Sequence, residues 1–122
     1  MSSVKVSEVF NSRIGSLCCT EEGMLFLLDN GHSRIYRIDL QNGDCNVIGR
    51  GNLDCPVDVT TFGMFLVVLT RTGLLIFTHM GVLLKKYCVQ YRSIPKGVAI
   101  SADAILVIGE NSEIYKFIIE IK

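Results

Sequence analysis

The chain has 122 residues, 12 lysines and arginines against 12 aspartates and glutamates, and a hydrophobic fraction of 49%. This length corresponds to about one domain, and the apolar composition excludes an intrinsically disordered chain, because such chains are polar and usually charged. A formal net charge of zero also argues against a general nucleic-acid or acidic-membrane binder, which needs clustered positive charge.

The cysteines and the N-terminal segment indicate a reducing compartment. The five cysteines are odd in number and include no Cys-x-x-Cys pair, so we interpret them as free thiols that act as small apolar core residues. Residues 1–8 lack the charged and apolar blocks of a signal peptide, and the longest apolar runs are far shorter than the roughly twenty residues of a spanning helix. We expect a soluble, cytoplasmic protein without membrane contact, in which residues 1–122 form a single all-β domain.

The first of three similar segments covers about residues 11–52. It contains four short apolar or alternating runs, at residues 14–19, 24–28, 34–39 and 44–48. Glycine or turn-forming residues bound these runs, which is typical of short strands joined by hairpins.

The second segment, about residues 53–92, follows the same plan with runs at residues 56–61, 65–69, 73–77 and 82–89. The run at 65–69, Phe-Leu-Val-Val-Leu, does not alternate between apolar and polar residues. It therefore predicts a strand that is buried on both faces.

The third segment, about residues 93–122, has runs at residues 95–100, 104–108 and 113–117. No fourth run follows them, but residues 4–10 alternate in the manner of a half-buried strand. We expect this N-terminal strand to complete a blade as its missing outer strand.

The spacing between the segments is regular. Pro56 and Pro95 lie 39 residues apart, Ile35 and Leu75 lie 40 apart, and Leu75 and Ile114 lie 39 apart. A period near 40 residues that is built from short strands is typical of propeller blades.

The third segment carries the motif most clearly, as Pro-x-Gly-Val-Ala-Ile followed by Ala-Ile-Leu-Val-Ile and Ile-Tyr-x-Phe. With these motifs, residues 4–122 resemble a run of three β-propeller blades of the NHL or WD40-like group. The resemblance implies an all-β fold of three four-stranded blades. The combined Gly-His…Trp-Asp signature of WD40 repeats is absent, since the sequence has no tryptophan.

Three blades are too few for a closed ring, because known propellers typically have four to eight. We expect two copies to close a six-bladed β-propeller by dimerisation. The alternatives are that the chain completes the ring of another propeller-bearing subunit, that it is a compact three-bladed monomer, or that it is a β-sandwich whose repeat is accidental.

In a propeller, the loops between blades share one face with the loops that join the second and third strands. That face offers a mixture of charged, amide and aromatic side chains, which suits a protein or peptide partner. The residues that we expect to bind a partner there are Asp29, Asn30, His32, Arg50, Arg71, Tyr91, Arg92, Glu110 and Asn111. We therefore expect a non-enzymatic, protein-binding scaffold; the alternatives are an NHL-like propeller that binds single-stranded RNA and a metal-dependent propeller hydrolase.

No complete catalytic, metal or cofactor motif occurs, so we expect no enzyme activity, no metal and no cofactor. His32 lies in a turn, and the Gly-x-Ser-x-Gly nucleophile elbow is absent. The Asp29-Asn30 and Glu110-Asn111 pairs occupy equivalent turns and could supply oxygen ligands. We interpret them as turn formers, since Arg71 follows Thr70 at the corresponding turn of the second segment.

Overall fold

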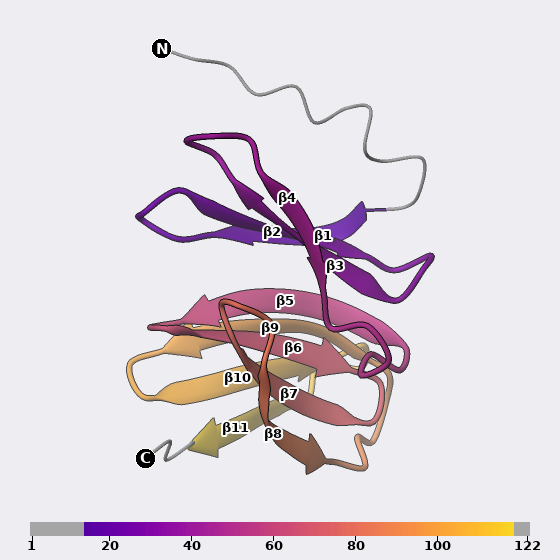
Figure 1. Cartoon of the computed structure of the whole chain (residues 1–122). Coiled ribbons are helices and arrows are strands. Elements are labelled where there is room, and N and C mark those ends of the chain that lie inside the picture. The colour runs from indigo at the N-terminus through magenta and orange to yellow at the C-terminus, as the bar shows by residue number, and fades with distance from the viewer. Residues whose placement is uncertain (1–13, 119–122) are drawn as a thin grey trace.

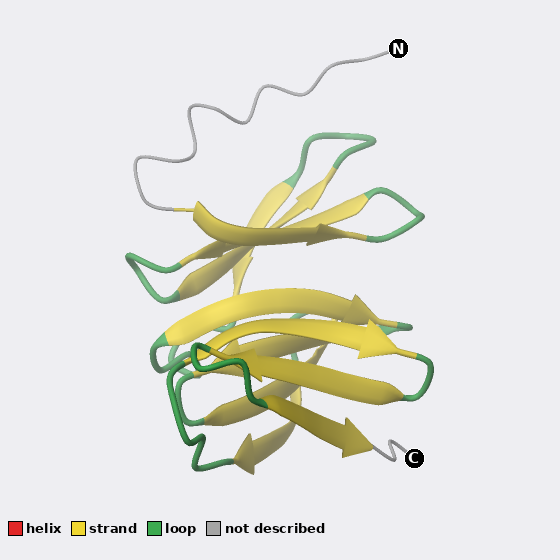
Figure 2. Cartoon of the chain, turned by 180° about the vertical axis from the view of Figure 1, so that it is seen from behind, coloured by secondary structure: helices red, strands yellow, loops and turns green. Residues whose placement is uncertain are grey.

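The computed structural model describes residues 14–118, which form eleven β-strands in three antiparallel sheets and no helix. Figure 1 shows the sheets following one another along the chain, and Figure 2, seen from behind, shows strands joined by loops. The all-β prediction is therefore confirmed. No helix in the described part of the chain is long and apolar enough to cross a membrane.

The first sheet contains, in chain order, β1 (Ile14–Cys19), β2 (Met24–Asp29), β3 (Arg34–Asp39) and β4 (Cys45–Ile48). These bounds agree with the predicted runs to within one residue. The alternation of β3 places Ile35 in the core shared with the second sheet and Tyr36 on the opposite face. The sheet is therefore apolar on both faces near its centre.

The second sheet contains β5 (Pro56–Phe62), β6 (Phe65–Thr70), β7 (Gly73–Thr78) and β8 (Leu83–Cys88), again in chain order. Strand β6 is buried on both faces, as predicted. The close pairing of β7 with β8 needs a glycine at position 73, because a Cβ there would lie 1.8 Å from the carbonyl oxygen of Tyr87.

The third sheet contains β9 (Pro95–Ser101), β10 (Ala104–Gly109) and β11 (Ile114–Ile118), with β10 in the middle. One face packs on the second sheet, but the other leaves Ile108, Ile114 and Ile118 exposed by 45%, 70% and 65%. Unlike β6, strand β10 is therefore exposed on one face at Ile108, since no described sheet covers this side. The predicted outer strand at residues 4–10 lies outside the described residues.

The hydrophobic core consists of two layers on either side of the second sheet. The layer toward the first sheet includes Phe26, Leu28, Leu66, Val68 and Phe77. The layer toward the third sheet includes Val67, Leu69, Leu74, Ile76, Ile105 and Val107. The second sheet therefore occupies the middle of the stack, and alternate residues of β6 face the two layers.

All five cysteines are free thiols, but their predicted role in the core holds only for Cys18. The other four are exposed, because they lie on edge strands or in loops. Burial, reinforced by the negative charge of Asp58, raises the pKa of the Cys18 thiol to about 12. Cys18 therefore stays protonated and unreactive at neutral pH.

The first strands of the three sheets, β1, β5 and β9, lie side by side and are joined by one carboxylate. Asp58 Oδ1 accepts hydrogen bonds from the Ser16 hydroxyl and from its neighbour's backbone, Val59 N (2.9 Å), and Oδ2 accepts one from Val98 N (2.9 Å). Ser16, Asp58 and Gly97 occupy the same position in their sheets, since each pairs with the fifth residue of the following strand. Asp58 is therefore a link between all three sheets.

Replacing this carboxylate should destabilise the whole stack. We expect Asp58→Ala to lower the free energy of unfolding by roughly 2–3 kcal/mol. The substitution removes hydrogen bonds to a charged group and leaves the backbone amide of Val98 without a hydrogen-bond acceptor. Ser16→Ala should cost about 1 kcal/mol. Urea unfolding checks both values. Asp103→Ala, in the exposed β9–β10 turn, is the control and should change little; equal losses for Asp58→Ala and Asp103→Ala would contradict the linking role.

Candidate functional site

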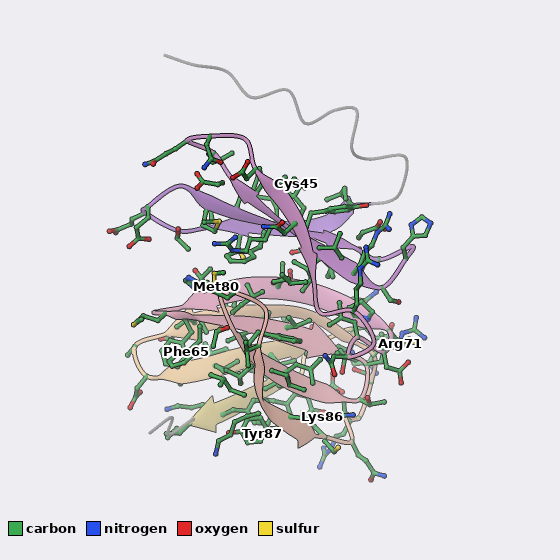
Figure 3. All side chains as sticks on the ribbon, viewed as in Figure 1. Cys45, Phe65, Arg71, Met80, Lys86 and Tyr87 are labelled. Carbon is green, nitrogen blue, oxygen red and sulfur yellow. The ribbon has the colours of Figure 1, made fainter. Side chains whose placement is uncertain are left out.

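Six of the nine predicted partner-binding residues come together at one end of the stack. They line two adjoining hollows with volumes of about 440 and 420 Å³, which share Arg71, Ile94 and Pro95. Figure 3 labels Arg71 at this end, opposite the end that carries Phe65 and Met80. The predicted residues that line the hollows are Asn30, Arg71, Tyr91, Arg92, Glu110 and Asn111.

Asp29 does not contribute to this surface, because its side chain is fully buried. Its carboxylate accepts hydrogen bonds from His32 N (3.2 Å) and Arg34 Nε (3.2 Å), and it lies 3.1 Å from His32 Nδ1. Asp29 therefore fixes the β2–β3 turn, and it lines neither hollow. His32 remains 56% exposed above it, but lines neither hollow.

The first hollow is lined by residues from the loops and strand ends of all three sheets. Asn30 Nδ2 donates a hydrogen bond to the carbonyl oxygen of Pro56 (2.8 Å). The amide oxygen of Asn30 lies against Gly15, where an added Cβ would be only 1.6 Å away. Asn30 therefore holds two sheets in register, and its side chain is engaged within the protein. Arg50 is exposed in the β4–β5 connection and lines neither hollow.

The second hollow lies between the β8–β9 connection and the β10–β11 turn, which are held together by hydrogen bonds. Glu110 N donates to the carbonyl oxygen of Ile94 (2.9 Å), and Asn111 N donates to the hydroxyl of Ser93 (3.4 Å). The same hydroxyl donates to Glu113 Oε1 (2.6 Å). Sequence reasoning missed Ser93 and Glu113, because no motif or spacing marks them as partners.

Tyr91 lines the second hollow and packs against Tyr115 behind it. The rings of Tyr91 and Tyr115 meet edge to face, with centroids 5.2 Å apart. The Tyr91 hydroxyl donates a hydrogen bond to the carbonyl oxygen of Gly73 (3.2 Å), and the Tyr115 hydroxyl accepts a hydrogen bond from Arg92 N (2.7 Å). Burial, together with the neighbouring Tyr115, raises the pKa of Tyr91 to about 12. The Tyr91 side chain is therefore protonated at pH 7 and held in place by both contacts.

The rim of the two hollows combines both signs of charge. Arg71, Arg92, Lys96 and Glu110 are all exposed there. Within the described residues, no group of three or more histidine, cysteine, aspartate or glutamate side chains is placed to hold a metal ion. The arrangement offers hydrogen bonds and charge to a ligand from several loops at once.

Comparison with known proteins identifies the fold. No known family model matches the sequence, and no curated protein matches it at a significant level. Among solved structures, the chain is similar to a streptogramin B lyase (14% identity, TM-score 0.65), covering 91% of this chain and 42% of the lyase. It is also similar to virginiamycin B lyase from Staphylococcus aureus (17% identity, TM-score 0.61), covering 87% of this chain and 41% of that one.

A third similar structure is the computationally designed Ika4 protein, with 8% identity and a TM-score of 0.58, covering 98% of this chain and 99% of the designed one. The chain spans less than half the length of the two lyases. At these identities the likeness establishes the fold alone. The three sheets are propeller-like blades, and the fold is all-β and propeller-like.

The hydrogen bond between Ser93 and Glu113 gives a testable pH effect. This bond is the largest cause that lowers the pKa of Glu113, and the charge of Arg92 acts in the same direction. A carboxylate with a lowered pKa stabilises the fold above its ordinary pKa, and that contribution is lost as pH falls through the lowered value. We expect Ser93→Ala to move the Glu113 midpoint upward in an NMR titration of the carboxyl carbon. Ser101→Ala, outside the hollow, should leave the midpoint in place; equal shifts in both variants would refute the assignment.

Proposed function

We propose that the chain is a non-enzymatic, protein-binding scaffold of β-propeller type, which binds a peptide segment of a partner at the two adjoining hollows. The observation that carries this proposal is the convergence of loops from all three sheets around Arg71, which lines both hollows. A peptide lying across Arg71 would contact both at once.

The chemistry of the rim favours a segment with acidic and apolar residues. Arg71, Arg92 and Lys96 offer positive charge, whereas Ile94, which is 41% exposed, and Pro95 offer an apolar contact between them. Arginine and aromatic residues are frequent where binding energy is concentrated.

A single-stranded RNA partner is the weaker alternative. Stacking with bases needs an open aromatic face and a continuous positive groove. Tyr91 is instead packed against Tyr115 and held by Gly73, and Glu110 interrupts the positive rim. These contacts favour a peptide partner.

Selection from a random-peptide display library tests the binding role. Peptides should be enriched on the wild-type chain and bind a variant with Arg71→Ser and Arg92→Ser about tenfold more weakly, since two exposed ion pairs are lost. A variant with Lys85→Ser and Lys86→Ser, on the outer strand β8, is the matched control and should bind as the wild type does. Absence of any enriched peptide, or equal binding to all three proteins, would reject the proposal. Retention on polyuridylate that falls steeply with salt would favour RNA instead.

We also propose that the exposed face of the third sheet packs on a neighbouring blade from a second copy of the chain, as in a six-bladed ring. A hollow of about 330 Å³ lies on this face and is lined by Leu106, Ile108 and Ile114 among others. The corresponding outer face of the first sheet is different, because Leu27, Tyr36 and Ile38 are already at most 6% exposed there. In a ring of two copies, the exposed apolar face of the third sheet would therefore meet a first-sheet face whose apolar side chains are already buried. Another propeller-bearing subunit is the alternative neighbour.

Light scattering behind a sizing column tests the second copy. A dimer should have twice the chain mass of 13.5 kDa, and Ile114→Asp should convert it to a monomer, because a charge would be buried at the contact. Leu84→Asp, on the exposed outer strand β8, should leave the dimer intact. A stable wild-type monomer at all concentrations would rule out the second copy.

A further inference from the structure

A third hollow lies at the opposite end of the stack, between the first and second sheets. Its volume is about 460 Å³, which is within the range of small-molecule sites. Figure 3 labels Phe65 and Met80 at this end. We call it the Arg37 hollow; its lining comprises Thr20, Glu22, Met24, Arg37, Gly63, Met64, Phe65, Thr78, His79 and Met80.

Arg37 has unmet hydrogen-bonding capacity. It lies on β3 opposite Phe26, on the face that packs toward the second sheet. Its Nε atom is buried and has no hydrogen-bond partner. Arg34, three residues earlier on the same strand, is instead paired with Asp29, with Nε 3.2 Å from a carboxylate oxygen. Because buried donors are nearly always satisfied in native proteins, the unpaired Nε of Arg37 needs an explanation.

The other walls of the hollow are mostly apolar and adaptable. Met64 and Met80 are 80% and 70% exposed, and their flexible thioether side chains can fit ligands of different shapes. His79 is held in place, with its ring 5.4 Å from that of Phe26 and its Nε2 3.3 Å from the carbonyl oxygen of Phe65. The hollow therefore combines one cation with a fixed aromatic end and a mobile apolar mouth.

Charge limits the ligand further. Glu22 is exposed at the rim, and no ion pair joins it to Arg37 among the described residues. Its carboxylate leaves the Arg37 guanidinium available, and its repulsion of an anionic ligand grows with the charge of that ligand. A monoanion with an apolar body fits these features better than a phosphate or a dicarboxylate.

We propose that the Arg37 hollow binds a small organic monocarboxylate, whose carboxylate accepts hydrogen bonds from Arg37 and whose apolar body lies against Met64 and Met80. Bidentate binding of carboxylates is a preferred interaction of arginine. The same chemistry belongs to a free aliphatic acid and to the C-terminal residue of a peptide. This site is independent of the peptide-binding hollows at the other end.

The test is a titration of the full chain with octanoate, octanol and N-acetyl-leucyl-leucine, followed by NMR of methionine methyl groups. Octanoate should shift the signals of Met24, Met64 and Met80 saturably, and octanol should not. Arg37→Met keeps a side chain of similar length and should weaken octanoate binding by about tenfold to a hundredfold. Arg71→Met, at the opposite end of the stack, is the matched control and should bind octanoate as tightly as the wild type does.

A second readout separates a ligand site from a structural role. Octanoate should raise the thermal midpoint of the wild type, because it binds the folded state. Arg37→Met should lose this rise yet have a higher midpoint than the wild type without ligand, since it removes an unsatisfied buried donor. If Arg37→Met does not fold, Met64→Glu places a carboxylate at the exposed mouth and should abolish octanoate binding.

Three results would overturn the proposal: equal binding of octanoate and octanol, undiminished binding to Arg37→Met, or undiminished binding to Met64→Glu. The peptide probe distinguishes the two sources of the carboxylate. Tighter binding of N-acetyl-leucyl-leucine than of octanoate identifies a peptide C-terminus as the ligand, and tighter binding of octanoate identifies a free acid.

Discussion

The structure depends on the packing of the second sheet between its two neighbours. Leu66 and Val68 face the first sheet, whereas Val67 and Leu69 face the third, and all four are completely buried. Burying a side chain of this kind contributes about 1.5–3 kcal/mol. Each core layer is formed by side chains of two sheets, so a blade can bury its apolar face only in contact with another blade. The positions of the loops at both ends of the stack follow from this packing.

The two ends of the stack differ in how their polar groups are satisfied. At the end that carries Arg71, the backbone and side-chain groups of the loops are largely paired with one another, as for Ser93 with Glu113 and for Asn30 with Pro56. The surface there is preformed, and its exposed charges remain for a partner. At the other end, Arg37 has a buried donor without an acceptor, surrounded by methionines. One end therefore suits recognition by an extended surface, and the other suits enclosure of a small ligand.

The sequence allows the strands to be predicted almost residue by residue, because glycines and polar turns bound every apolar run. Local pattern also predicts that Ile35 and Tyr36 face opposite ways. It does not predict the burial of Asp29. The residue pattern does not show that His32 and Arg34, three and five residues away, fold back onto this carboxylate. Likewise, the exposure of Ile108 depends on whether a further sheet covers β10, which no local pattern encodes. The Arg37 hollow is assembled from turns of two different blades, so its residues are far apart in the sequence.

The link made by Asp58 has a direction. Ser16 of the first sheet reaches Asp58 of the second, and Asp58 reaches the backbone of the third. Gly97 stands at the equivalent position of the third sheet and has no side chain to extend toward a following blade. A joint on the far side of the third sheet therefore lacks the side-chain link that Asp58 makes between the described sheets. Under mechanical load, the hydrogen bonds of this one carboxylate would resist separation of the three described blades.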